Sequence, residues 1–548
     1  MLRFSVLPAV LIVSLLILTT TQVCPKDLIS REDLIEDARQ LAATIEEVHP
    51  DPYINGGGKI AFHRRLRHML TSISDGGMTV EDFYELICPF VTSIGDAHTW
   101  LNSPDEFDYG LPLVLSAVGS SFYVSIVPDE ASRDLMGALL LDIEGVPVEE
   151  LISRAGRYVS GENDYQRIRN LTGTGMLFNR WWIERLLPEW QGGDRIAATL
   201  RLADGRTVTR SLNRNAPWES GSAIGFDSEI VQPSTEKCDF AYSFLDSAGT
   251  SALLVINDMM TYREAFEMWA SHGYTDNDKQ AAEIYRRYHD EDPPRDRASL
   301  IAGLPSATEL FRSLTTEMKA AKTMNLFVDL RRNGGGNSAM SELLVYFLYG
   351  KEKLLTLKGK NVEIRRLSDT YFARNDNFTL EVLNTDRQVP LTRGDYDFRY
   401  DFANNGEATP ESVLRMIEEF AATMPTFSEE YNSEAYSGHY LPENVVVLCS
   451  PQTFSSGFTL MYYLHQAGAL ITGTPSAQAG NCFGDVMGFD LEHSRLHFTV
   501  SHKYFELFPG DDETGRLLMP DYPITYQILA SYDFDSNAEI LYMLDILE

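Results

Sequence analysis

Residues 444–466 read NVVVLCSPQTFSSGFTLMYYLHQ, and this stretch decides the fold class of the C-terminal half of the chain. The apolar run at residues 445–448 predicts a buried strand, and residues 458–466 predict a helix. A short polar turn that contains Ser455 joins the two. A buried strand that leads through a tight turn into a helix is typical of an α/β domain.

The same alternation of strands and helices extends over the rest of the C-terminal part. Apolar runs at residues 252–256 and 325–330 predict two further buried strands. We therefore expect an α/β domain over residues 221–548. Stretches that are charged or rich in Asp and Asn, near residues 275–297 and 374–408, interrupt the pattern and predict two insertions.

The N-terminal part follows different patterns. Apolar residues recur at helical spacing, as at Leu34, Ala38 and Leu41, and predict a helical domain over residues 31–104. Short alternating or apolar segments predict a β-rich region over residues 105–220. A chain of 548 residues is too long for one hydrophobic core, so we expect a multidomain protein with α+β and α/β parts.

Charge excludes two classes of partner. The net charge of -33 repels nucleic acid and anionic lipid headgroups, and no basic run offsets it. Five cysteines without CxxC spacing predict no structural zinc site, and no other pattern calls for a metal or a cofactor. Pairing among these cysteines cannot be deduced from the sequence.

The first residues resemble an export signal. Arg3 precedes an apolar run from Phe4 to Leu18, which predicts a signal segment over residues 1–24. We therefore expect a secreted, periplasmic or extracellular protein. An uncleaved N-terminal segment would be its one membrane anchor, since no later stretch is long and apolar enough to span a bilayer.

Ser455 is the first candidate for chemistry. A serine between a strand and a helix projects its hydroxyl outward and has the amides of the helix N-terminus beside it, as a nucleophile requires. Serine is also a common helix cap, and this structural role is the more frequent one for a serine at such a junction. The position of Ser455 alone therefore does not decide between the two roles.

A second junction carries a run of glycines. The strand at residues 325–330 leads into Arg331-Arg332-Asn333-Gly334-Gly335-Gly336, and a helix is predicted from Ser338 to Tyr349. Glycine amides at a helix N-terminus can hold an anion, such as a phosphate or the oxyanion of acyl transfer. The spacing matches neither nucleotide-binding glycine motif, and a turn kept for tight packing is an equal alternative.

These motifs together resemble the tail-specific, or C-terminal processing, peptidase superfamily. The resemblance rests on Asp329-x-Arg331-x-Asn333-x-Gly335-Gly336, on Thr453-x-Ser455-Ser456-Gly457, and on Gly473-Thr474-Pro475 and Pro520-Asp521. His49-Pro50-Asp51-Pro52-Tyr53 and Gly95-Asp96-Ala97-His98-Thr99 resemble the N-terminal region of its tricorn-like branch, and residues 137–152 resemble its PDZ element. The resemblance implies a helical N-terminal domain, a PDZ-like middle region and a ClpP/crotonase-like α/β catalytic domain.

The resemblance also implies a catalytic set. One branch of the superfamily uses a lysine downstream of the serine, but no lysine occurs between Pro451 and His502. The tricorn and chlamydial-protease-like branches use an N-terminal histidine, which His98 matches, oriented by a glutamate after the serine. Glu513 lies near the expected distance, and Glu506 is a rival. The amides of Gly335 and Ser456 would hold the oxyanion.

We therefore expect an exported serine endopeptidase that acts on protein or peptide substrates through an acyl-enzyme on Ser455, with His98 as general base. The alternative is a catalytically inactive peptide- or ligand-binding protein on the same fold. Two other residues compete for roles: His439 as the base and Cys482 as a nucleophile. The oligomeric state cannot be predicted from this sequence.

Overall fold

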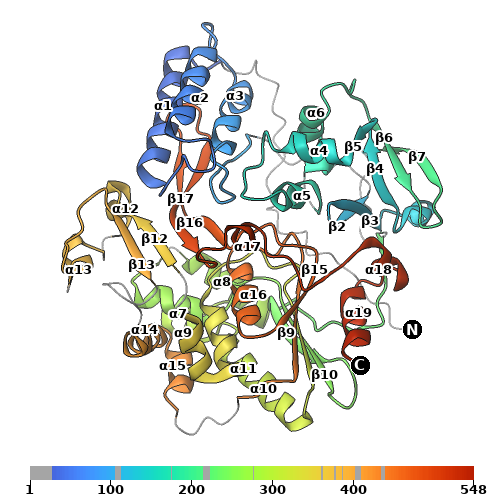
Figure 1. Cartoon of the computed structure of the whole chain (residues 1–548), viewed down its shortest axis with the longest axis vertical. Helices are drawn as coiled ribbons and strands as arrows, with labels where there is room; N and C mark the ends of the chain where they lie inside the picture. Colours follow the sequence, from blue (N-terminus) through green and yellow to red (C-terminus); the bar gives the residue numbers. More distant parts are fainter. Residues whose placement is uncertain are drawn as a thin grey trace. The chain divides into compact units, whose positions relative to one another are not determined.

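The computed structural model describes residues 28–104, 113–173, 176–213, 223–275, 277–358, 362–375, 378–385, 387–400, 409–433 and 439–548. The predicted signal segment, residues 1–24, and parts of the predicted insertion at residues 374–408 lie outside the described residues. The chain forms two compact units (Figure 1). The first contains residues up to Gly161, 167–227 and 486–501, and the second contains residues 162–166, 228–485 and 502–548. Within the described ranges, no helix has the length and apolar character needed to cross a membrane.

A six-stranded sheet forms the centre of the second unit. Its order is β18 (Tyr522–Pro523), β15 (Leu470–Gly473), β14 (Asn444–Cys449), β11 (Asn325–Asp329), β10 (Ser251–Ile256) and β9 (Phe240–Phe244). All neighbours are parallel except β9, which is antiparallel to β10. The buried strands predicted at residues 252–256, 325–330 and 444–448 are therefore confirmed as three adjacent central strands.

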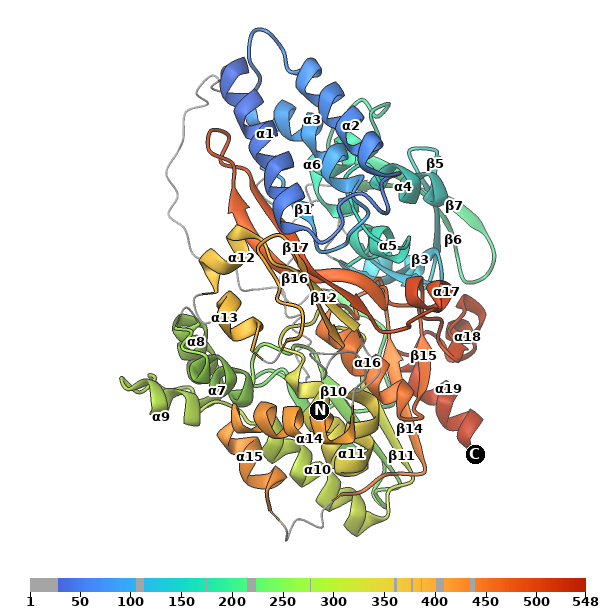
Figure 2. The same ribbon diagram turned by 60° about the vertical axis from the view of Figure 1, so that its left-hand side comes forward.

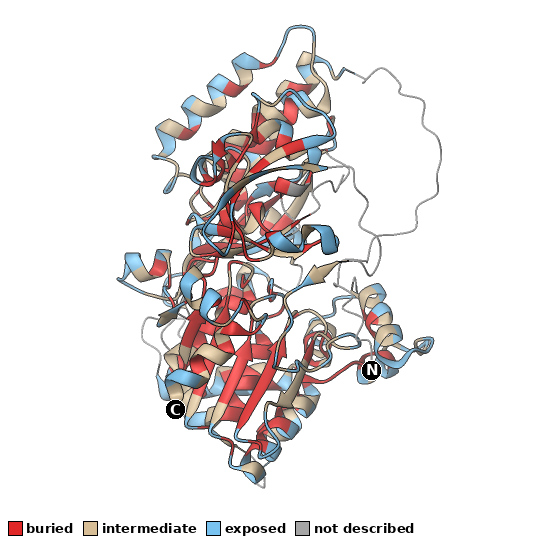
Figure 3. Ribbon diagram, turned by 90° about the vertical axis from the view of Figure 1, so that its right-hand side faces the viewer, coloured by how far each residue is buried: buried red, intermediate tan, exposed pale blue. Residues whose placement is uncertain are grey.

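Helices cover both faces of this sheet, so its central strands are apolar throughout. One face packs on α10 (Ala307–Ala321), α11 (Ala339–Lys358) and α16 (Ser456–Gln466). The other face packs on α19 (Ala538–Leu547). The central strands are therefore almost entirely buried, and they appear as red arrows in the lower half of Figure 3. Two-sided burial explains why these strands lack the alternation of a sheet with one wet face.

The other elements of the second unit lie around this core. The charged stretch near residues 275–297 contains α8, which packs with its neighbours through a small apolar cluster of its own. Strand β12 pairs with β13 and with the second half of β17 (His497–Glu506). The remaining elements are α7 (Arg263–Ser271), α8 (Asp278–His289), α9 (Arg297–Ala302), β12 (Val362–Arg366), α12 (Asp369–Arg374), α13 (Leu380–Leu383), β13 (Tyr396–Tyr400), α14 (Pro410–Ala422), α15 (Pro425–Tyr431), α17 (Asp512–Arg516) and α18 (Tyr526–Ser531).

The first unit begins with three helices, α1 (Arg31–Val48), α2 (Lys59–Ser72) and α3 (Val80–Thr92). A sheet follows in the order β2 (Val114–Val118), β3 (Ser121–Val127), β4 (Leu139–Ile143), β6 (Arg195–Arg201) and β7 (Thr207–Asn213). Its smaller elements are β5 (Val146–Pro147), α4 (Val148–Ala155), most of α5 (Tyr165–Leu171), α6 (Arg180–Leu186) and β8 (Ile224–Gly225). The strand, turn and helix start predicted at residues 137–152 are confirmed as β4, β5 and α4, with positive φ at the turn.

One hairpin is divided between the units. Strand β16 (Asn481–Asp490) pairs with β17, and Figure 2 shows them as one long hairpin. Residues 486–501 of this hairpin belong to the first unit, where β17 pairs with the short strand β1 (Trp100–Leu101). The predicted histidine segment and the C-terminal part of the chain therefore meet inside the first unit.

Candidate active site

The turn that follows β14 is tied to the end of the neighbouring strand β11. The Ser450 hydroxyl donates to the Arg331 carbonyl at 2.6 Å, and the Thr453 hydroxyl donates to the Leu330 carbonyl at 2.8 Å. The Phe454 amide donates to the Asn333 carbonyl at 2.9 Å. These bonds join two segments about 120 residues apart, so the positions of the two strand ends determine the shape of the turn.

Ser455 has a backbone conformation that L-residues rarely adopt. Its φ is 52° and its ψ is -122°. Such a conformation costs about 1–3 kcal/mol and persists only where the surrounding structure enforces it, often at functional sites. Ser455 occupies the cap position of α16, yet its side chain makes no capping hydrogen bond. The common structural role of a serine at this position is therefore not the one that Ser455 has.

The glycine run passes directly against Ser455. Gly335 has a φ of +108°, and a Cβ at Gly335 would lie 2.6 Å from the Ser455 Cβ and 3.0 Å from the Ser456 amide nitrogen. The Ser456 hydroxyl donates to the Gly336 carbonyl at 2.6 Å. Glycine is required at position 335 both for its φ and for this approach. The structure thus brings Ser455, Ser456 and Gly335 together.

The Gly335 amide already has one acceptor. It donates to the Asn333 Oδ1 at 2.9 Å, and the Asn333 Nδ2 donates to the Ile256 carbonyl at 3.0 Å. Asn333 is fully buried, and a Cβ at Gly457 would lie 2.6 Å from its Oδ1. Asn333 therefore holds the glycine loop against both the sheet and the start of α16.

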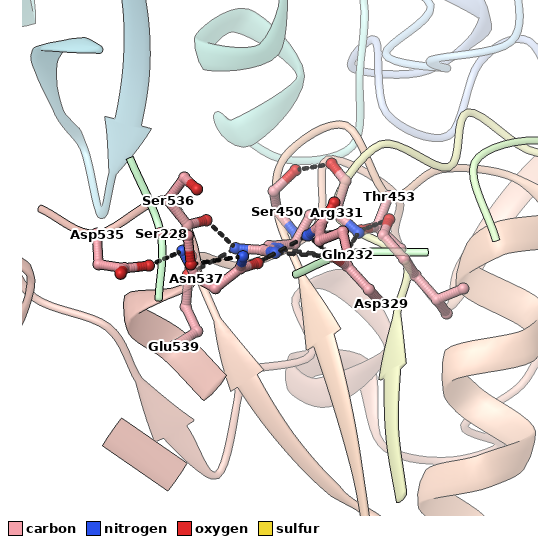
Figure 4. A network of polar contacts seen from close by, with 11 residues as sticks. Ser228, Gln232, Asp329, Arg331, Ser450, Thr453, Asp535, Ser536, Asn537 and Glu539 are labelled. Atoms are coloured by element: carbon pink, nitrogen blue, oxygen red, sulfur yellow. Dashed lines mark hydrogen bonds and ion pairs between the residues drawn. The ribbon is translucent and has the colours of Figure 1, made fainter. Parts of the chain in front are cut away.

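Arg331 explains the first part of the glycine motif. Its guanidinium makes a bidentate contact with Asp329, with hydrogen bonds of 3.0 and 2.7 Å. It also donates to the Glu539 carboxylate at 2.7 Å and to the Asn537 Oδ1 at 2.8 Å (Figure 4). Burial alone would raise the pKa of Asp329, but Arg331 lowers it below the usual range. The Arg331 carbonyl accepts from the Ser450 hydroxyl, so this network also stabilises the turn that contains Ser455.

Gln478 stands in the segment where the processing branch of the superfamily has its lysine. The Gln478 Oε1 accepts from the Ser455 amide at 3.3 Å. Its Nε2 donates to the Ala479 carbonyl at 3.0 Å and to the Cys482 Sγ at 2.7 Å. Gln478 is buried. The sequence reasoning missed this contact, although the glutamine lies within the segment that it singled out for lacking a lysine.

The cysteines in the described part of the chain form no disulfide bonds with one another. They are Cys88, Cys238, Cys449 and Cys482. Cys482, the alternative nucleophile, is only 5% exposed and lies on β16. Within the residues that the structure describes, no group of three or more His, Cys, Asp or Glu side chains could hold a metal ion.

His98 belongs to the first unit and is half-buried in the turn between α3 and β1. Its amide donates to the Asp96 Oδ1 at 2.8 Å, and its carbonyl accepts from the Thr499 hydroxyl at 3.0 Å. Burial is the largest single influence and would raise the pKa of Asp96, but the hydrogen bonds from His49 and Thr99 and the interactions with the His49 and His98 rings together lower it to about 2. Asp96 is therefore a carboxylate at neutral pH.

The two candidate glutamates lie in the second unit. Glu513 is exposed in the first turn of α17, and among the described residues its carboxylate makes no hydrogen bond or ion pair. Glu506 is half-buried at the end of β17, opposite Val362 of β12. Neither carboxylate is joined to Ser455 by a hydrogen bond between described residues.

His439 lies at the wrong end of the sheet to serve Ser455. It precedes the start of β14 and packs edge-on against Tyr346, with 4.8 Å between the ring centroids. Ser455 follows the other end of the same strand. Five steps of about 3.3 Å separate the two ends by roughly 17 Å, so His439 cannot be the base in this structure.

A serine with a strained backbone, on a strand-to-helix turn beside a glycine loop, has the geometry that a nucleophilic serine requires. The model of peptidase family S41 matches residues 299–506, which include Ser455 and the glycine run. This part of the chain is similar to family S41, and the protein is a serine-type peptidase with its S41 domain in the C-terminal part.

Solved structures support the same fold. Mature CPAF in complex with lactacystin is 14% identical, with a TM-score of 0.53 over 94% of this chain and 99% of that one. Mature CPAF alone is 13% identical, with a TM-score of 0.53 over 94% of this chain and 98% of that one. No curated protein sequence matches the chain. The likeness to CPAF shows a shared fold.

Proposed function

We propose that this protein is an exported serine endopeptidase that cleaves protein or peptide substrates through an acyl-enzyme on Ser455. The observation that carries the proposal is the state of Ser455. Its backbone is held in a rare conformation, its side chain is not used as a helix cap, and Gly335 passes against its Cβ. A serine kept only as a helix cap would need none of these features.

In the proposed reaction, His98 takes the proton of the Ser455 hydroxyl as the Oγ attacks the peptide carbonyl. The C–N bond then breaks, the proton passes to the leaving amine, and water hydrolyses the ester by the reverse sequence. Glu513 would hold the His98 ring in the required tautomer.

The oxyanion would be held by the amides of Ser456 and Gly335. Ser456 is the first residue of α16, so the helix dipole favours negative charge beside it. The Gly335 amide also donates to Asn333, so it would be shared between that acceptor and the oxyanion. The Ser455 amide donates to the Gln478 Oε1, and we assign it no part in the oxyanion hole.

The remaining expectations form part of the same proposal. Residues 31–104 would be the helical domain that supplies His98, residues 105–220 would carry a PDZ-like element, and residues 221–548 would form a ClpP/crotonase-like catalytic domain. The PDZ-like element would capture an extended peptide by strand addition. Residues 1–24 would direct export, and the strongly acidic chain would have no nucleic-acid partner.

Labelling with a fluorophosphonate tests the proposal, because the probe reacts only with an activated serine. We expect labelling of the folded protein, its loss in Ser455→Ala and a strong reduction in His98→Ala. Ser494→Ala is a matched control, since that hydroxyl is buried and makes no hydrogen bond with another described residue. A folded protein that is not labelled would instead support the inactive binding protein on the same fold.

A further inference from the structure

Side chains form hydrogen bonds with both backbone groups of His98, its amide and its carbonyl. Asp96 accepts from the His98 amide at 2.8 Å, and Thr499 donates to the His98 carbonyl at 3.0 Å. One of these partners lies two residues away and the other lies 401 residues away. The position of His98 therefore depends on the far end of the chain as well as on its own loop.

Asp96 is the centre of this arrangement. It is fully buried, and its Oδ2 accepts from the Ser501 hydroxyl at 2.7 Å and from the His49 Nε2 at 3.3 Å. The Asp96 amide donates to the Ser160 hydroxyl at 3.0 Å. A buried carboxylate costs free energy unless it is fully hydrogen-bonded, so this set of donors is needed to keep it ionised.

The tautomer of His49 follows from its two contacts. Its Nδ1 accepts from the Asp51 amide at 3.1 Å, so that nitrogen carries no hydrogen. Its Nε2 then carries the hydrogen and donates to Asp96. His49 is therefore a hydrogen-bond donor to Asp96 through Nε2, and this contact orients the carboxylate.

Two hydroxyls on one face of β17 complete the support. Thr499 and Ser501 are two residues apart, so their side chains point to the same side of the strand. Both side chains are buried. The Ser501 amide also donates a hydrogen bond to the Thr99 hydroxyl at 3.1 Å. Strand β17 thus presents a polar face to the His98 turn, where an apolar face would have sufficed for packing alone.

We propose that Asp96, held by His49 and Ser501, is a positioning residue that fixes the His98 turn for catalysis, with Thr499 fixing it from the other side. The proposal rests on the proposed function of His98 as general base. The Asp96 carboxylate accepts from the His98 amide, so its negative charge would also favour the imidazolium that forms when His98 takes the serine proton.

The test compares Ser501→Ala and Thr499→Val with Ser494→Ala in the full-length protein. Each of the first two removes one support of the His98 turn and leaves the reacting side chains themselves unchanged. We expect each to lower kcat for peptide hydrolysis by about tenfold, with KM unchanged within about twofold, because a displaced base affects the chemical step rather than binding. Ser494→Ala should leave both constants unchanged.

A double-mutant cycle separates positioning from a general loss of stability. If Ser501 acts through His98, then Ser501→Ala should cause no further loss of fluorophosphonate labelling in a His98→Ala background. Asp96→Asn should behave like Ser501→Ala, with a larger effect. Thermal unfolding shows whether the Asp96→Asn protein is folded. If it is not, the result for Ser501→Ala decides whether the positioning role holds.

The outcomes distinguish this inference from the proposed function. If His98→Ala labels as fast as the wild type, the role of His98 fails and the positioning role fails with it. If His98→Ala is impaired but Ser501→Ala and Thr499→Val match Ser494→Ala, only the positioning role is refuted. An additive loss in the double variant would also refute it, since the two residues would then act independently.

Discussion

Replacing Gly335 with alanine tests how closely the glycine loop fits against the nucleophile. The new Cβ would lie 2.6 Å from the Ser455 Cβ, 2.9 Å from the Phe454 carbonyl oxygen and 3.0 Å from the Ser456 amide nitrogen. These contacts are too short, and none of the three atoms is at the end of a flexible side chain. A φ of +108° adds about 1–3 kcal/mol of backbone strain, and the forced repacking adds about 1–3 kcal/mol more.

Gly468 provides a control with the same backbone strain and no steric clash. Its φ is +109°, and a Cβ there would meet no atom within 4 Å. Gly468→Ala should therefore lose only the strain contribution, about 1–3 kcal/mol in the free energy of unfolding. The difference between the two variants isolates the contact with Ser455.

The assay is the rate of fluorophosphonate labelling in protein shown to be folded by circular dichroism. Moving a reacting group by about 1 Å costs roughly 100-fold in rate, so Gly335→Ala should label about 100-fold more slowly than the wild type. Gly468→Ala should label within about twofold of it. Equal labelling rates in the two folded variants would refute the claim that the glycine loop positions Ser455.

Three further predictions concern the groups around the site. Arg331→Lys cannot keep the bidentate contact with Asp329, so the free energy of unfolding in urea should fall by about 3 kcal/mol. Burial lowers the pKa of His502 from 6.5 to about 4, so its stabilising contribution is present above pH 6.5 and is lost as the pH falls towards 4. At pH 5 this loss is about 2 kcal/mol, and the thermal midpoint of His502→Gln should depend less on pH than that of the wild type. Gln478→Met removes the acceptor of the Ser455 amide and should slow labelling about tenfold, whereas unchanged labelling would show that this contact is incidental.

The local elements of the catalytic domain could be predicted from the sequence. The runs at residues 252–256, 325–330 and 444–448 became the three central strands, because two-sided burial requires continuous apolar residues and such runs are visible in sequence. The glycine run and Ser455 were found at the ends of two of these strands. The predicted helix at residues 338–349 extends to Lys358, across a non-helical Gly350 that local periodicity did not reveal.

The roles of particular side chains depended on contacts between distant residues. The sequence allowed Ser455 to be a cap or a nucleophile, and only the structure shows that its side chain makes no capping bond. His439 was a competing base until the direction of β14 placed it at the opposite end of the sheet from Ser455. Gln478 was passed over because nothing in its local sequence indicates that its amide reaches Ser455.

The sequence by itself therefore determined the α/β character of the C-terminal part, the two junctions that carry Ser455 and the glycine run, and the segment that carries His98. The tertiary structure alone decided that Gly335 lies against Ser455, that Arg331 draws in Asn537 and Glu539, and that β17 holds the His98 turn. The physical reason is the range of the interactions. Strand and turn patterns arise from neighbouring residues, whereas these contacts join residues that only the folded chain brings together.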